Sequence, residues 1–121
     1  MKKFDIYSKD KYIGWSNLKK KDVSTGVVYG QFCPLAGYKK IQQLIQKQID
    51  IDKLDKEEAS KLEQELKQLE LRVKPENSKF FEPVVEVHIN DFSHLLKPED
   101  MEVMVLGLDY QAYKKWFDDE K

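Results

Sequence analysis

Residues 38–71 have the sequence YKKIQQLIQKQIDIDKLDKEEASKLEQELKQLEL, which contains neither glycine nor proline. Glutamine, lysine, glutamate and leucine dominate the stretch, and these residues favour helix. Apolar residues recur at helical spacing in two stripes, at positions 41, 44, 45 and 49 and again at 59, 62, 66 and 69. The stretch therefore predicts a helical insertion at about 38–71.

The two stripes predict two helices rather than one long helix. Between them, residues 49–54 contain aspartate and β-branched residues, which weaken helix propensity. Asp55, followed three residues later by Glu58, is typical of a capping-box start for the second helix. We therefore expect a helical hairpin.

Short apolar runs on both sides of the insertion predict strands. They are residues 4–7, 12–15, 27–33, 85–89 and 102–108. A polar turn joins the first two runs into a hairpin, and the lysines at 19–21 lead into a loop that ends near Gly26. Gly30, inside the third run, indicates a bulge or a close approach of two backbones.

The order of elements is βββ–αα–ββ–α, with Asp109 as the expected N-cap of the closing helix. Strands grouped on either side of a helical insertion indicate the α+β class. We expect an antiparallel or mixed sheet of about five strands with the helices packed on one face. The length of 121 residues suits a single domain over residues 1–121.

Charge is divided unevenly along the chain. Residues 1–40 contain nine lysines and three aspartates, a net charge of +6, whereas residues 41–121 have a net charge of −7. A nearly neutral total of −1 therefore combines a basic amino-terminal third with an acidic remainder. Such an uneven distribution of charge indicates what kind of partner the protein could bind, and it does not indicate catalytic chemistry.

The single cysteine, Cys33, excludes an internal disulfide and fits a reducing compartment. No signal-peptide pattern follows the first lysines, and no apolar run approaches the ~20 residues of a membrane-spanning helix. These features predict a cytoplasmic protein that does not enter a membrane. Burial of Cys33 as a small apolar side chain is favoured over a nucleophilic role.

The chain has no glycine-rich phosphate loop and no nucleophile elbow. The alternative of a small metal-dependent enzyme depends on His88, Asp91 and His94, which together offer two imidazoles and a carboxylate. Their spacing fits an exposed strand histidine and a loop histidine better than a zinc site. We therefore expect a protein that is not an enzyme and that has neither a metal nor a cofactor.

A second alternative is a nucleic-acid-binding module that uses the lysine-rich amino-terminal hairpin. The lysines at 2, 3, 9, 11 and 19–21 lie near Tyr12 and Trp15 in the sequence, and single strands bind to such basic and aromatic surfaces. Two features argue against a nucleic-acid-binding module: Arg72 is the one arginine in the sequence, and the isoelectric point of the chain is near 6.1.

Acidic side chains favour a basic protein partner instead. They lie on the exposed face of the second predicted helix and at the chain end, where electrostatic steering would bring such a partner. The expected partner-binding residues are Glu57, Glu58, Glu63, Glu65, Asp118, Asp119 and Glu120.

Two segments support a resemblance. The first is GVVYGQFCP at residues 26–34, followed by Tyr38, Ile41 and Gln42. The second is VLGLDY at residues 105–110, followed by Tyr113, Trp116 and Phe117. Both resemble motifs of small uncharacterised bacterial α+β proteins; the motifs look architectural and imply no functional residue.

In size, acidity and single-domain α+β design, the chain also resembles the immunity proteins of bacterial toxin systems. Proteins of that class block a co-encoded toxin by masking its active site. The resemblance implies a non-enzymatic module that binds and neutralises a toxin, for example a basic nuclease.

Overall fold

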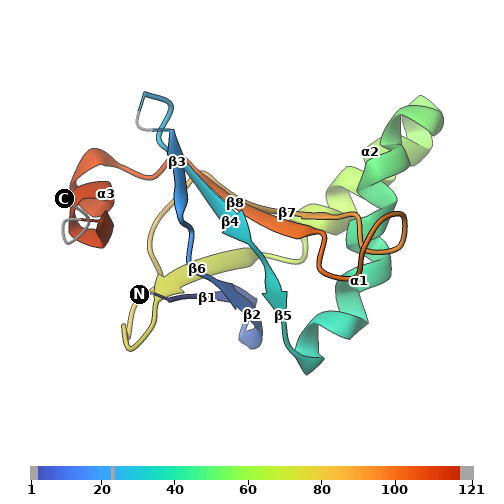
Figure 1. Cartoon of the computed structure of the whole chain (residues 1–121). Helices are drawn as coiled ribbons and strands as arrows, with labels where there is room; N and C mark the ends of the chain where they lie inside the picture. The colour runs from blue at the N-terminus through green and yellow to red at the C-terminus, as the bar shows by residue number, and fades with distance from the viewer. Residues whose placement is uncertain (1–2, 23, 118–121) are drawn as a thin grey trace.

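The structure is a computed structural model, and it describes residues 3–22 and 24–117. Its strands are β1 (Phe4–Ser8), β2 (Lys11–Ser16), β3 (Lys20–Asp22), β4 (Val27–Gln31), β5 (Cys33–Pro34), β6 (Leu71–Pro75), β7 (Glu86–Asp91) and β8 (Met101–Leu106). Its helices are η1 (Ala36–Tyr38), α1 (Lys39–Gln46), η2 (Lys47–Lys53), α2 (Lys56–Lys67) and α3 (Tyr110–Phe117), where η denotes a 3₁₀ helix. Figure 1 shows α1 and α2 at one side of the strands and α3 at the other.

The α+β class is confirmed, but the expected single sheet of about five strands is wrong. The strands form two antiparallel sheets of four, in the orders β5-β2-β1-β6 and β3-β4-β8-β7. β3 begins within the lysine run that was expected to lead into a loop, and β6 begins at Leu71, where the helical insertion was expected to end. The helices also do not share one face, because α3 packs on the side away from α1 and α2.

One long bent hairpin joins the two sheets. Its first arm is β2 followed by β3, and its second arm is β4 followed by β5. Trp15 pairs with Cys33 in the first sheet, whereas Lys20 pairs with Tyr29 in the second. The hairpin thus runs through both sheets and holds them around one core.

The bend requires a residue without a side chain at position 30. A Cβ atom on Gly30 would lie 2.8 Å from Ser16 Oγ and 3.0 Å from the Leu18 amide nitrogen. The close backbone approach expected at this glycine is therefore confirmed.

The core lies between the sheets and continues under α3. Phe4, Ile6 and Val73 come from the first sheet, and Val28, Val103 and Val105 come from the second; all are at most 1% exposed. The Phe4 ring lies 4.5 Å from the ring of Trp116 on α3. Asp109 Oδ1 accepts a hydrogen bond from Ala112 N at 2.8 Å, which confirms the predicted cap of this helix.

The helical insertion contains the two helices and the break that its sequence predicts. Asp55 Oδ1 accepts a hydrogen bond from Glu58 N at 2.8 Å and caps α2. Asp50, within η2, has non-helical backbone angles, so the chain bends between α1 and α2. In the described residues, no helix combines the length and apolar character needed to cross a membrane.

Candidate functional site

The candidate site lies along the outer edge of β7, which is the edge of this strand without a neighbouring strand in its sheet. Facing residues of an antiparallel strand pair alternate between hydrogen-bonded and non-hydrogen-bonded pairs. Phe92 N donates to Asp100 O at 2.9 Å, so the even-numbered residues of β7 form the hydrogen-bonded pairs with β8. The N–H and C=O groups of Val87 and Ile89 therefore point away from β8. Gln48 Nε2 donates to Ile89 O at 3.3 Å from the helical side.

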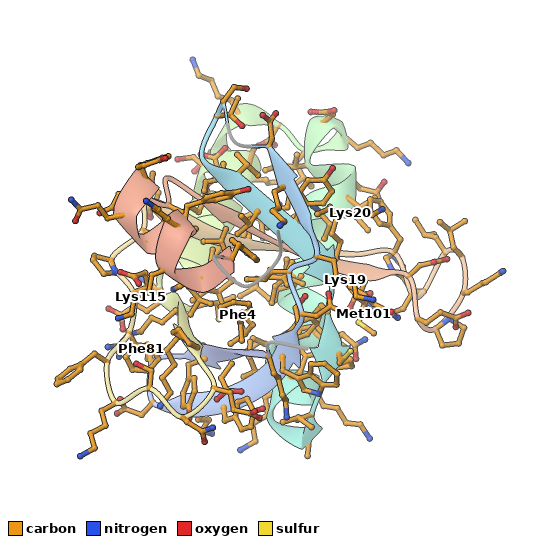
Figure 2. All side chains as sticks on the ribbon, turned by 60° about the vertical axis from the view of Figure 1, so that its left-hand side comes forward. Phe4, Lys19, Lys20, Phe81, Met101 and Lys115 are labelled. Carbon is orange, nitrogen blue, oxygen red and sulfur yellow. The ribbon has the colours of Figure 1, made fainter. Side chains whose placement is uncertain are left out.

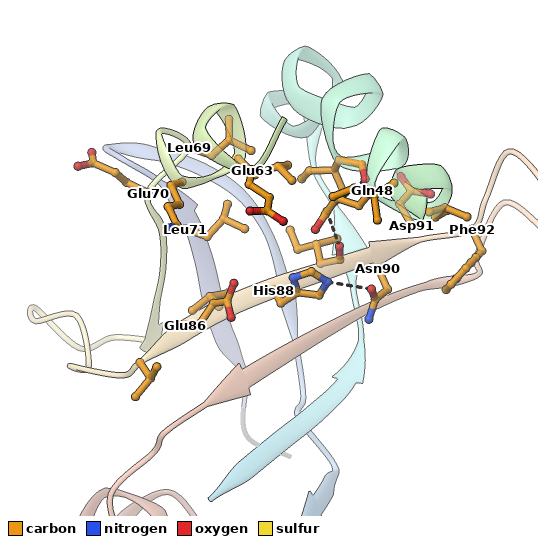
Figure 3. Close-up of a pocket in the computed structure, with 18 residues that line it drawn as sticks. Gln48, Glu63, Leu69, Glu70, Leu71, Glu86, His88, Asn90, Asp91 and Phe92 are labelled. Carbon is orange, nitrogen blue, oxygen red and sulfur yellow. Dashed lines mark hydrogen bonds between the residues drawn. The ribbon is translucent and has the colours of Figure 1, made fainter. Parts of the chain in front are cut away.

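A cleft of about 690 Å³ runs along this edge. It lies between β7, the carboxyl-terminal half of α2 and the chain that leads into β6. Figure 3 shows the cleft and the side chains around it. Apolar side chains from α1, from α2, from the start of β6 and from β7 contribute to its lining: Ile45, Leu66, Leu69, Leu71, Val87 and Ile89. A volume of this size is typical of ligand-binding clefts.

Three glutamates border the cleft. Glu63 comes from α2 and is directed into the space between the helix and the strand, whereas Glu70 lies at one end with its carboxylate turned outward. Glu86 comes from β7 on the opposite bank. Lys67 is the one lysine among the lining residues, so the rim is acidic.

His88 also borders the cleft, on the half-buried face of β7. Its Nε2 lies 3.0 Å from Asn90 Oδ1. Because an amide oxygen accepts hydrogen bonds, this contact assigns the ring proton to Nε2. The two side chains share one face of the strand and form a polar strip along it.

Asp91 lies on the opposite face of β7 and is fully buried. Its carboxylate accepts hydrogen bonds from Tyr38 Oη at 2.6 Å, Ser93 Oγ at 2.5 Å, Ser93 N at 2.9 Å and Gln42 Nε2 at 3.1 Å. Burial alone would raise the pKa of Asp91, but the hydrogen bonds from Ser93, Tyr38 and Gln42 outweigh it and lower the pKa. The network attaches η1 and α1 to the end of β7.

The residues of the candidate metal site do not come together. His88 and Asp91 lie on opposite faces of β7, and His94 is exposed in the loop beyond that strand. Asp91 is already occupied by the hydrogen bonds of Tyr38, Ser93 and Gln42. Within residues 3–22 and 24–117, no group of three histidine, cysteine or acidic side chains is placed to bind a metal ion.

The predicted partner-binding glutamates do not form one patch. At 100° per residue, Glu63 and Glu65 lie on opposite sides of the α2 stripe that buries Leu62. Of the four on this helix, Glu63 alone lines the cleft. Glu57 borders a shallow depression with Lys56 and Lys61, which are basic.

Glu58 lies beside the cap, where the neighbouring Asp55 carboxylate raises its pKa. The three predicted residues Asp118, Asp119 and Glu120 lie outside the residues that the structure describes. Sequence reasoning missed Glu70 and Glu86, because neither belongs to the helix face on which it concentrated.

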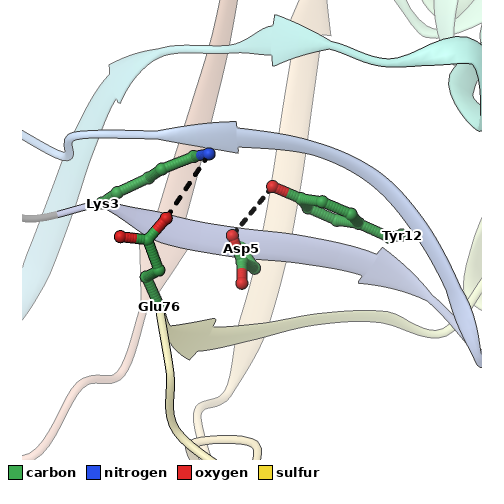
Figure 4. Close-up of polar contacts among 4 residues, drawn as sticks. All are labelled: Lys3, Asp5, Tyr12 and Glu76. Carbon is green, nitrogen blue, oxygen red and sulfur yellow. Dashed lines mark hydrogen bonds and ion pairs between the residues drawn. The ribbon is translucent and has the colours of Figure 1, made fainter.

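The lysines of the amino-terminal third are likewise divided between the two sheets. Lys3 Nζ lies 3.5 Å from Glu76 Oε2 and 4.9 Å from the centroid of the Trp15 ring (Figure 4). Tyr12 Oη donates to Asp5 Oδ1 at 2.9 Å on the same sheet. Lys19 and Lys20 lie well apart from Phe81, whose ring packs against Tyr7 of this sheet (Figure 2). The expected basic track along one hairpin is therefore not continuous.

Comparison with protein-family models, with curated proteins and with solved structures gives no match to this chain.

Proposed function

We propose that the chain is a non-enzymatic protein-binding module whose acidic cleft beside β7 receives a basic segment of another protein. A role like that of the immunity proteins fits this chemistry: the chain would bind a co-encoded toxin and cover its active site. The toxin would be a basic protein such as a nuclease. The single cysteine, Cys33, is free and half-buried, which suits a reducing cytoplasm.

The observation that supports this function is the combination of an apolar lining with an acidic rim. Among the apolar lining residues, Leu66, Leu69 and Leu71 are half-buried and supply area that a partner removes from water. Glu63, Glu70 and Glu86 supply a negative potential that attracts a basic partner and disfavours an acidic one.

Inhibition would follow from occlusion. A nuclease binds the phosphates of its substrate with lysine and arginine side chains, so its active site is positively charged. Carboxylates on the rim of the cleft would occupy the positions that substrate phosphates otherwise take. The basic segment could then no longer bind nucleic acid.

The test is co-expression of the chain with the proteins encoded by its neighbouring genes, followed by measurement of Kd for the complex at several salt concentrations. The variant E63Q/E70Q/E86Q removes the rim charges, and the matched control D10N/E57Q/E99Q removes the same charge from exposed positions away from the cleft. We expect the rim variant to weaken binding by about tenfold or more, with a smaller salt dependence. Equal affinity of the two variants would contradict the proposed function.

A further inference from the structure

We infer that the partner enters the cleft as an added β-strand: an extended basic segment pairs with the outer edge of β7 through the backbone groups of Val87 and Ile89. This inference rests on the proposed function and specifies how the cleft binds. Added strands obtain affinity from backbone hydrogen bonds, and the side-chain environment along the edge provides selectivity.

The first observation is that the backbone of β7 at Val87 and Ile89 has no neighbouring strand of its sheet on the outer side. The alternation of hydrogen bonds with β8 directs the N–H and C=O of Val87 and Ile89 toward the cleft. The Gln48 side-chain amide already bonds to Ile89 O at 3.3 Å. An amide N–H from an incoming backbone has the same chemistry and would replace it. Backbone polar groups that become buried need partners, and a second strand supplies them in register.

Exposed apolar side chains mark both ends of this edge. Val85 is 82% exposed at one end and Phe92 is 38% exposed at the other, and both line the cleft. The eight residues from 85 to 92 span about 26 Å when extended. An added strand of this length would cover both side chains.

The charges on the two sides of the cleft determine which kind of segment can bind in it. Glu86 lies on the β7 bank, and Glu63 and Glu70 lie on the bank formed by α2 and the start of β6. A strand between them meets carboxylates on each side, which favours a segment rich in lysine or arginine. A second copy of this chain would bring the same three carboxylates and so oppose its own binding.

The experiment uses a fluorescein-labelled ten-residue peptide in which lysine alternates with valine or threonine, and it measures Kd by fluorescence anisotropy. In V87P, proline removes the N–H that points into the cleft and leaves the bonds to β8 in place. The reference is V87A, which shortens the same side chain and keeps the N–H. We expect V87P to bind the peptide about fivefold or more weakly than V87A. Equal binding by V87P and V87A would overturn the inference.

A second measurement uses the unmodified chain and does not depend on the folding of a variant. Saturation with the peptide should slow hydrogen exchange at the Val87 amide by about tenfold or more, as followed by NMR. An unchanged exchange rate at Val87, or no binding of the peptide, would overturn strand addition. Protection of Val87 that rises with protein concentration without peptide would overturn it in favour of a second copy. If E63Q/E70Q/E86Q still weakens the natural complex, the proposed function stands without this binding mode.

Discussion

The two halves of β7 differ in how their polar groups are satisfied. At the Asp91 end, Tyr38, Gln42 and Ser93 surround a buried carboxylate with hydrogen bonds. At the Val87 end, the backbone faces an open cleft. The chain thus closes one half with its own side chains and leaves a cleft beside the other half, where we propose that a partner binds. We expect the first half to contribute to stability and the second to binding, so the two can be tested separately.

The largest expected effect is on the closed half. D91A removes the acceptor for Tyr38 Oη, Gln42 Nε2 and the Ser93 groups and leaves those donors inside the protein. We expect the free energy of unfolding to fall by about 3 kcal/mol, as measured by urea denaturation. The control D10A, at an exposed turn, should change it by less than about 0.5 kcal/mol. A loss below about 1 kcal/mol in D91A would show that the two halves do not differ in this way.

A smaller effect is expected from Y38F, which removes one donor and keeps the ring that packs against Phe32. It should cost about 1.5 kcal/mol in the free energy of unfolding near neutral pH. A urea series near neutral pH would measure this cost, and a value near zero would indicate that the Tyr38 hydroxyl is dispensable to the closed half.

The pH dependence of stability follows from the same contact. Because the folded chain lowers the pKa of Asp91 below its unfolded value near 3.9, ionisation of Asp91 stabilises the fold above about pH 4. This stabilisation is lost as the pH falls through the folded pKa. In Y38F the pKa of Asp91 should rise toward its ordinary value, so acid unfolding should begin at higher pH than in the unmodified chain. Identical acid unfolding curves by circular dichroism would contradict this.

Gln48 lies at the boundary between the two halves. Q48A removes the side-chain hydrogen bonds to Ile89 O and Ile45 O and should cost about 0.7 kcal/mol of stability, because the Ile89 carbonyl gains access to water in the cleft. Thermal unfolding measures this cost. If Q48A lowered the free energy of unfolding as much as D91A does, Ile89 O would belong to the half of β7 whose polar groups stabilise the fold.

The smallest effect on stability is expected from E86Q, on the open half. Glu86 is exposed and has no ion pair among the described residues, so the free energy of unfolding should change by less than about 0.5 kcal/mol. Its effect should appear in partner affinity and in the salt dependence of that affinity. A marked loss of stability in E86Q would show that the rim charge serves the fold rather than binding.

Local patterns in the sequence predicted the elements that depend on near neighbours. The caps at Asp55 and Asp109, the break near Asp50 and the strand around Val103 were all predicted in this way, and the structure confirms each of them. Each of these features depends on residues within a few positions of one another.

The division into two sheets was not predictable in the same way. It depends on pairings between distant residues, such as Tyr7 with Arg72. Two strands are also poorly marked in the sequence: β3 is Lys-Lys-Asp and has no apolar residue, and β6 alternates as Leu-Arg-Val-Lys over four residues only, directly after a helical pattern and before a proline. Such short charged segments become strands only when a neighbouring strand supplies the hydrogen bonds.

Of the three glutamates that border the cleft, Glu63 alone was among the partner-binding residues expected from the sequence. Glu70 lies after α2, where a φ of +47° turns the chain into β6, and no helix pattern extends to that point. Asp91 was expected among possible metal ligands, since nothing in the sequence indicates that Tyr38 donates to it from 53 positions away. The cleft itself arises because two edge strands from different sheets lie side by side, which is a property of the assembled fold.

The pairing of β1 with β6 has a consequence for synthesis on the ribosome. The bent hairpin has all its residues once position 34 has emerged, whereas β1 receives its second neighbour only after position 75 has done so. During that interval the growing chain presents the free edge of β1, and such edges pair readily with other chains. Translation speed through the helical insertion would then influence how much of the newly made protein aggregates.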